Sequence, residues 1–264
     1  MSWHVLERDG AKLRGLDNGE GPPVVFQHGL GGDEAQIAEI FPASGYRRLT
    51  LECRGQGKSE PGNPDGFSIA NFADDVLAFA DARKVDRFVM GGISMGAAIS
   101  LRIAIKHPER VKALVLARPA WRIGRAPENM QVIAKAAPFI RTGDRAGFSA
   151  SQTAQMLTID GPDNLASLLG NFDKADPLMV ANLLNAIAAD GPGVTEAEVR
   201  RIKAPTLVIG TGQDFIHPMP HAEWLAKRIA GAKLVEITSK AADKGRYVEE
   251  FRAALAAFLS EQES

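Results

Sequence analysis

The chain has 264 residues, of which 45% are apolar and 24% charged, with a formal net charge of −1. These are ordinary globular proportions, and the length allows one large domain or two moderate ones. Both signs of charge are interspersed, so the composition gives no reason to expect nucleic acid or an anionic membrane surface as a partner. Cys53 is the only cysteine. It excludes an intramolecular disulfide and suits a cytoplasmic location.

The N-terminal residues 1–9 lack the basic stretch and apolar core of a secretory signal. The longest uncharged run, residues 88–101, is too short to span a bilayer and contains glycines. We therefore expect a cytoplasmic protein that acts on a small molecule. The sequence does not fix its oligomeric state.

Short apolar runs alternate with longer segments of helical period, which predicts βαβ units and a mostly parallel sheet with helices on both faces. The first segment, residues 3–16, contains the hairpin signal Asp9-Gly10 and is expected to form an antiparallel edge. Further strands are expected at 24–27, 48–52, 87–91, 112–117, 206–209 and 233–237. Helices are expected at 68–82, at 95–106, after a capping box that starts at Thr195, and at 247–259.

Residues 119–193 break this alternation, because no period-two pattern occurs there. Short helical segments begin at prolines such as Pro127 and Pro162. We expect a helical cap, inserted between the sixth and seventh strands of an α/β core made of residues 1–118 and 194–264. Its apolar side chains should pack together and partly line an apolar pocket. Three arginines near its start are expected to lie in solvent rather than to bind an anion, although a carboxylate substrate would suit them: Arg118, Arg122 and Arg125.

The strongest chemical signal is Gly92-Ile93-Ser94-Met95-Gly96, between an apolar strand and a helix. A sharp strand-to-helix turn strains the backbone at the serine and needs small residues on both sides. The helix N-terminus behind the hydroxyl favours negative charge. A serine that only caps the helix is the structural alternative. The two flanking elements favour Ser94 as a nucleophile with unfavourable backbone angles.

The loop Gln27-His28-Gly29-Leu30-Gly31-Gly32 follows another apolar strand. A tetrahedral oxyanion needs two backbone N–H donors aimed at one point. The N–H groups of Leu30 and Met95 are the candidates. His28 is expected to brace the loop rather than to react.

Three motifs, in this order and spacing, resemble the α/β-hydrolase superfamily: His28-Gly29-Leu30-Gly31-Gly32, Arg54-Gly55-Gln56-Gly57-Lys58-Ser59 and Gly92-Ile93-Ser94-Met95-Gly96. Gly210-Thr211-Gly212-Gln213-Asp214 extends the resemblance to nearly the whole chain apart from the cap. The resemblance implies a central, mostly parallel sheet, a helical cap, no metal and no organic cofactor. It also implies that Asp214 orients a catalytic imidazole, whereas a plain turn residue is the alternative. Arg54 is expected to be an internal brace.

The resemblance implies a catalytic histidine after the last strand, near Ala241, but residues 238–247 contain none. Four explanations stay open. The base has been deleted by engineering, His217 has taken the role, Lys240 serves as the base, or the protein binds a small apolar ligand without turnover. If His217 is the base, its closeness to Asp214 in sequence leaves open whether Asp214 or another group orients it. The leading hypothesis is a serine hydrolase that acts on a small ester, lactone, thioester or activated C–C bond.

Overall fold

A computed structural model describes residues 2–42 and 44–262. Its described residues form one eight-stranded sheet in the order β1-β2-β4-β3-β5-β6-β7-β8. The strands are β1 (Ser2–Arg8), β2 (Ala11–Asn18), β3 (Pro23–Gln27), β4 (Arg47–Leu51), β5 (Phe88–Ile93), β6 (Val111–Ala117), β7 (Thr206–Thr211) and β8 (Lys233–Ile237). Only the pairings β1–β2 and β2–β4 are antiparallel. The mostly parallel sheet and the antiparallel hairpin at its edge are thereby confirmed.

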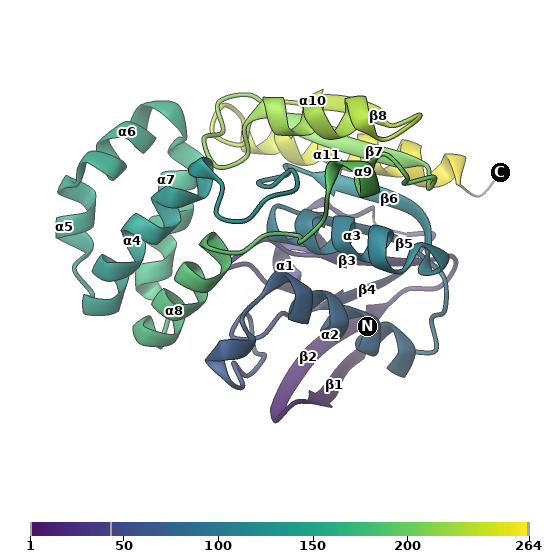
Figure 1. Cartoon of the computed structure of the whole chain (residues 1–264), viewed down its shortest axis with the longest axis horizontal. Helices are drawn as coiled ribbons and strands as arrows, with labels where there is room; N and C mark the ends of the chain where they lie inside the picture. Colours follow the sequence, from purple (N-terminus) through teal and green to yellow (C-terminus); the bar gives the residue numbers. More distant parts are fainter. Residues whose placement is uncertain (1, 43, 263–264) are drawn as a thin grey trace.

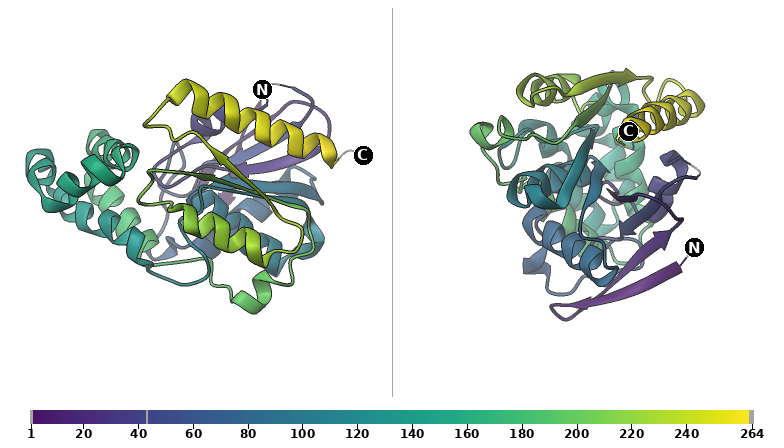
Figure 2. Two further views of the ribbon diagram at one scale, coloured as in Figure 1. Left: turned by 90° about the horizontal axis from the view of Figure 1, so that it is seen from above. Right: turned by 90° about the vertical axis from the view of Figure 1, so that its right-hand side faces the viewer.

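Helices cover both faces of the sheet (Figures 1 and 2). One face carries α1 (Glu34–Ile40) and α11 (Lys244–Glu261), whose apolar residues pack against Val24, Phe26 and their neighbours. The other face carries α2 (Ile69–Ala82), α3 (Met95–Lys106) and α10 (Met219–Arg228). Shorter helices lie between these elements: η1 (Pro64–Gly66), η2 (Pro108–Arg110) and α9 (Glu196–Val199).

The segment between β6 and β7 stands beside the sheet as a separate group of helices in Figure 1. These are η3 (Glu128–Met130), α4 (Gln131–Thr142), α5 (Arg145–Ala150), α6 (Gln152–Asp160), α7 (Pro162–Gly170), η4 (Asn171–Asp173) and α8 (Pro177–Ala188). Residues 119–193 are all described and contain no strand. Their aromatic rings pack on one another, with Phe148 between Phe139 and Phe172. We propose that these helices act as one cap.

Two helices have no counterpart among the sequence expectations. α1 is only seven residues long and buries just Ile37 and Ile40 among its apolar residues, too few to show a helical period. α10 begins after Pro218, and its apolar positions are interrupted by charged ones. α11 starts earlier than expected because the Asp243 side chain accepts a hydrogen bond from the Arg246 N–H and caps the helix. No helix among the described residues is long and apolar enough to cross a membrane.

Arg54 is an internal brace, as predicted. Its Nε and Nη2 atoms donate to the two carboxylate oxygens of Asp75 at 2.7 and 2.8 Å, and both side chains are buried. Asp75 lies on α2, so this pair ties the loop after β4 to a helix that packs against the sheet. A buried pair of this kind is costly to break, because either charge is left without its partner.

Close packing of α3 against the sheet fixes the turn that carries Ser94. A Cβ at Gly96 would lie 2.3 Å from the carbonyl oxygen of Gln27, and one at Gly92 would lie 2.4 Å from the carbonyl carbon of Gly96. Backbone atoms cannot give way as a flexible side chain can. The two glycines of the motif are therefore required by the approach of α3 to β3 and β5.

Gly96→Ala should lower the free energy of unfolding by about 1–3 kcal/mol, because the added methyl group forces α3 away from Gln27. Gly170→Ala is the matched control, since a Cβ there meets nothing within 4 Å. It should change stability by less than about 1 kcal/mol. Urea denaturation of both variants measures the difference. Equal stability of the two variants would contradict the packing argument.

Candidate active site

Ser94 lies at the turn between β5 and α3, with φ 57° and ψ −111°. This left-handed conformation is unfavourable for a residue with a side chain, as the sequence predicted. The Ser94 N–H donates to the carbonyl oxygen of Ala117 at 2.9 Å, which ties the turn to the end of β6. The side chain is partly exposed at the carboxyl edge of the parallel strands, where sites of open α/β sheets form.

The loop after β3 passes directly beside Ser94. A Cβ at Gly29 would lie 3.5 Å from the Ser94 Cβ. The N–H groups of Gly29 and Gly31 donate to the side-chain oxygens of Gln36 and Gln56, both at 2.7 Å. The N–H groups of Leu30 and Met95 have no acceptor among the described residues. The loop is thus anchored on both sides of Leu30, which leaves two donors for a ligand oxygen.

His28 braces this loop. Its Nε2 accepts the Cys53 N–H at 3.0 Å, so its Nδ1 carries the proton and donates to the Gly29 carbonyl oxygen at 2.8 Å. Burial lowers the pKa of the imidazole, which keeps the ring neutral. Both ring nitrogens are occupied by backbone groups, so His28 is not placed to take a proton from Ser94.

His217 reaches Ser94 from the loop after β7. Its Nε2 lies 2.8 Å from Ser94 Oγ, and its Nδ1 lies 2.8 and 2.9 Å from the two carboxylate oxygens of Asp214. Of the two possibilities left open by the sequence, Asp214 is therefore the group that contacts the ring. The loop turns back on itself, and the His217 N–H donates to Asp214 Oδ1 at 3.1 Å. One carboxylate thus closes the turn and contacts the ring.

Arg118 is buried, and the expectation that it lies in solvent is wrong. Its Nε and Nη2 atoms donate to Asp214 Oδ2 at 2.8 and 2.6 Å. Arg118 directly follows β6 and Asp214 follows β7, and these strands are parallel neighbours. The carboxyl ends of such strands meet at one edge of the sheet, which brings the two side chains together. The other two arginines differ, since Arg122 lies over the Trp224 ring and Arg125 is exposed beside Asp190.

The charges at this site are strongly coupled. Burial alone would raise the pKa of Asp214, but His217 and Arg118 outweigh it and hold that pKa well below its usual range. Burial lowers the pKa of His217 below 6.5, and Arg118 lowers it further against the opposing effect of Asp214. At neutral pH Asp214 is a carboxylate and His217 is a neutral imidazole. The ring can accept a proton from Ser94.

Lys240 and Ala241 lie in the loop after β8, beside the cap residue Asp163. Burial raises the pKa of Asp163, while the charge of Lys240 and a hydrogen bond from the Ala241 backbone act to lower it. No hydrogen bond among the described residues joins Lys240 to Ser94. Of the two candidate bases, only His217 is within hydrogen-bond reach of the serine.

A cap residue that the sequence did not indicate also contacts the site. Asn164 on α7 donates from Nδ2 to Asp214 Oδ1 at 2.9 Å, and its Oδ1 accepts the Ile216 N–H at 3.0 Å. An asparagine inside a helical segment, far from Asp214 in sequence, carries no motif that could have identified it. Its role is visible only in the folded chain.

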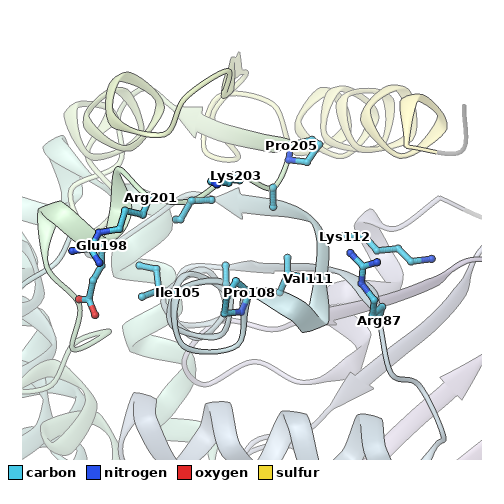
Figure 3. Close-up of a pocket in the computed structure, with 12 residues that line it drawn as sticks. Arg87, Ile105, Pro108, Val111, Lys112, Glu198, Arg201, Lys203 and Pro205 are labelled. Carbon is cyan, nitrogen blue, oxygen red and sulfur yellow. The ribbon is translucent and has the colours of Figure 1, made fainter.

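Two cavities bear on where a ligand can bind. The larger, about 550 Å³, is lined by residues at or just before the N-terminal ends of β5, β6 and β7, such as Arg87, Lys112 and Pro205 (Figure 3). It therefore lies at the edge of the sheet opposite Ser94. A smaller pocket, about 180 Å³, lies between α8 and Gly31. Among the described residues, no group of three His, Cys, Asp or Glu side chains could hold a metal ion.

A mostly parallel sheet with Ser94 on a strained strand-to-helix turn defines a hydrolase of the α/β type. Residues 22–243 match the model of the alpha/beta hydrolase fold family, and the chain belongs to this family. The protein is therefore an enzyme, a hydrolase.

Three similar proteins place it among enzymes of that family. The pyrrolizixenacetamide deacetylase of Xenorhabdus hominickii is 29% identical over 252 residues, which cover 92% of each chain. The enol-lactonase of Burkholderia xenovorans is 28% identical, with a TM-score of 0.75 and coverage of 97% of this chain and 100% of that one. Est816, described as an N-acyl homoserine lactone degrading enzyme, is 26% identical, with a TM-score of 0.70 and coverage of 98% and 99%.

The pKa of His217 should lie below 6.5 in the folded protein, and Arg118→Met should raise it, because a neighbouring cation is removed. NMR titration of the ring signal that is lost in His217→Ala measures both values. Because the unfolded chain binds this proton more tightly, the resulting stability is present above pH 6.5 and declines as the pH falls below it.

Arg122→Met is the matched control for this titration. Burial and then Arg122 lower the pKa of His221 to about 4, so this variant should raise the pKa of His221 and leave that of His217 in place. A pKa of His217 at or above 6.5, or one that Arg118→Met does not move, would contradict the electrostatic account.

Proposed function

We propose that the protein is a serine hydrolase that cleaves a small ester, lactone, thioester or activated C–C bond through an acyl intermediate on Ser94. The observation that carries the proposal is the continuous hydrogen-bond chain from Ser94 through His217 to Asp214, with closest contacts of 2.8 Å at each link. This chain supports His217 as the general base and Asp214 as the group that orients it.

In the proposed mechanism, Ser94 Oγ attacks the substrate carbonyl carbon while its proton passes to His217 Nε2. The His217 Nδ1–H stays hydrogen-bonded to Asp214, which stabilises the imidazolium. The carbonyl oxygen becomes an oxyanion and accepts hydrogen bonds from the N–H groups of Leu30 and Met95. His217 then gives the proton to the leaving group. Water, deprotonated by the same imidazole, attacks the acyl-enzyme and releases the acid and Ser94.

The named activities of the similar proteins support acyl chemistry. They are the removal of an acetyl group, the opening of an enol-lactone and the degradation of an N-acyl homoserine lactone. All three reactions begin at a carbonyl carbon bound to a nitrogen or oxygen leaving group. The two lactone reactions favour the ester and lactone part of the proposed range.

The small pocket beside Gly31 is the place we propose for part of the substrate, although Ser94 itself does not line it. Its volume is about 180 Å³, and α8 contributes Met179, Val180 and Leu183 to its wall. These apolar side chains suit the alkyl part of an acyl or alcohol group, whereas Lys174 and Asp176 lie at its polar side.

The rival hypotheses of a deleted base and of a protein that binds without turnover both depend on the absence of a base near Ser94. His217 Nε2 lies 2.8 Å from Ser94 Oγ, so a candidate base is present and neither rival hypothesis is needed. A neutral imidazole beside the hydroxyl, with a carboxylate on its other nitrogen, is the arrangement that activates serine. The enzyme hypothesis is therefore the one we retain.

A fluorophosphonate probe should label Ser94 in the unmodified protein and fail to label Ser94→Ala. His217→Ala should slow labelling and the hydrolysis of p-nitrophenyl acetate by roughly 10⁴-fold or more, because the hydroxyl then has no base. Lys240→Ala should leave both rates within about twofold, because Lys240 does not reach Ser94. Normal labelling of His217→Ala, or its loss in Lys240→Ala, would refute His217 as the base.

A further inference from the structure

The cap holds the loop that carries the candidate base. Ile216 precedes His217, and its backbone N–H and C=O groups each form a hydrogen bond with an asparagine side chain of the cap. Asn164 Oδ1 accepts the Ile216 N–H at 3.0 Å, and Asn129 Nδ2 donates to the Ile216 carbonyl oxygen at 2.6 Å. The backbone next to the imidazole is thus fixed from outside the sheet.

Each asparagine also has a second contact that makes it a bridge. Asn164, which is only 3% exposed, donates to Asp214 Oδ1 at 2.9 Å. One amide therefore joins the carboxylate to the peptide N–H that lies between it and His217. Asn129 Nδ2 also donates to the Ala120 carbonyl oxygen at 2.9 Å, which links the start of the cap segment to the same loop.

The sheet by itself holds only one side of the Asp214 carboxylate. Arg118 donates twice to Oδ2, and the Thr211 hydroxyl is 3.3 Å from the same oxygen. Oδ1 receives its contact from outside the loop through Asn164. The cap also packs closely on the loop, since a Cβ at Gly161 would lie 3.1 Å from the Phe215 Cβ.

This anchoring matters because the carboxylate and the imidazole sit only three residues apart on one loop. Any tilt of that loop moves Asp214 and His217 together, so their mutual contact does not restrain the ring relative to Ser94. A displacement of about 1 Å in a reacting group can cost about 100-fold in rate. The restraint has to come from elements outside the loop.

We propose that Asn164 and Asn129 are positioning residues for the base. Their contacts with the loop 214–217 then set the reactivity of Ser94. This inference rests on the proposed role of His217. Neither asparagine has a hydrogen bond to Ser94 among the described residues, and both act through the loop 214–217.

Fluorophosphonate labelling kinetics separate positioning from folding. Asn164→Ala and Asn129→Ala should each lower the rate constant for labelling of Ser94 by about 10- to 100-fold, with the labelled fraction unchanged. Asn182→Ala is the matched control, because that cap asparagine accepts a hydrogen bond from Arg141 at 2.8 Å, remote from the loop. It should label at the normal rate. A reduced labelled fraction that reacts at the normal rate would show partial unfolding instead and overturn the proposal.

Asn164→Asp serves if the alanine variant does not fold. It keeps the volume and the acceptor for the Ile216 N–H, but it replaces the donor to Asp214 by a second carboxylate. Labelling at neutral pH should again be slower at least 10-fold, because the two carboxylates repel and displace Asp214. A normal rate in this variant would overturn the role of the Asn164–Asp214 contact.

A double-mutant cycle tests whether Asn164 acts through His217. In the His217→Ala background, Asn164→Ala should cause no further loss, because the base that it positions is gone. An additional loss of 10-fold or more would assign Asn164 a separate role and overturn the proposal. If His217→Ala alone labels normally, the proposed function fails and this inference with it. If His217→Ala is slow and Asn164→Ala is normal, only this inference fails.

Discussion

A carboxylate taken out of water is stable only when other groups replace its lost hydration, and the Asp214 side chain is such a group. Its hydrogen-bond partners come from three parts of the fold. Arg118 follows β6, Asn164 belongs to the cap, and His217 shares the loop after β7. None of these parts can be removed without leaving a buried charge incompletely satisfied. The arrangement around Ser94 therefore depends on the sheet, the cap and the loop being assembled together.

Arg118 changes the electrostatics of this site as well as its geometry. Its guanidinium shares the Asp214 carboxylate with the imidazole, so part of the negative charge that would stabilise a protonated ring is already neutralised. Burial lowers the pKa of His217, and Arg118 lowers it further against the opposing effect of Asp214. A base with a lowered pKa accepts a proton less avidly, but it remains unprotonated and available under mildly acidic conditions. Arg118 thus favours the unprotonated form of His217, whereas Asp214 opposes this effect.

The features that the sequence predicts well are those whose cause is local. The strands are visible as apolar runs, and the turn at Ser94 is visible because its steric requirement falls on the neighbouring Gly92 and Gly96. His217 appears in the sequence only as one of several candidates, because its reach to Ser94 depends on how the loop after β7 folds. Arg118 was misassigned to solvent for a similar reason: its partner follows the adjacent strand. Asn164 lies in a segment whose packing has no sequence signature, so only the structure identifies it.

The position of the proposed base, His217, on the loop after β7 rather than after β8 fits the way in which the cap contacts these two loops. The resemblance to other hydrolases implies a histidine near Ala241, yet the Ala241 backbone N–H binds the carboxylate of Asp163. Asp163 precedes Asn164 at the start of α7, so the same end of this helix meets the loop after β8 and the loop 214–217. One end of α7 therefore contacts both the loop after β8 and the loop that carries His217.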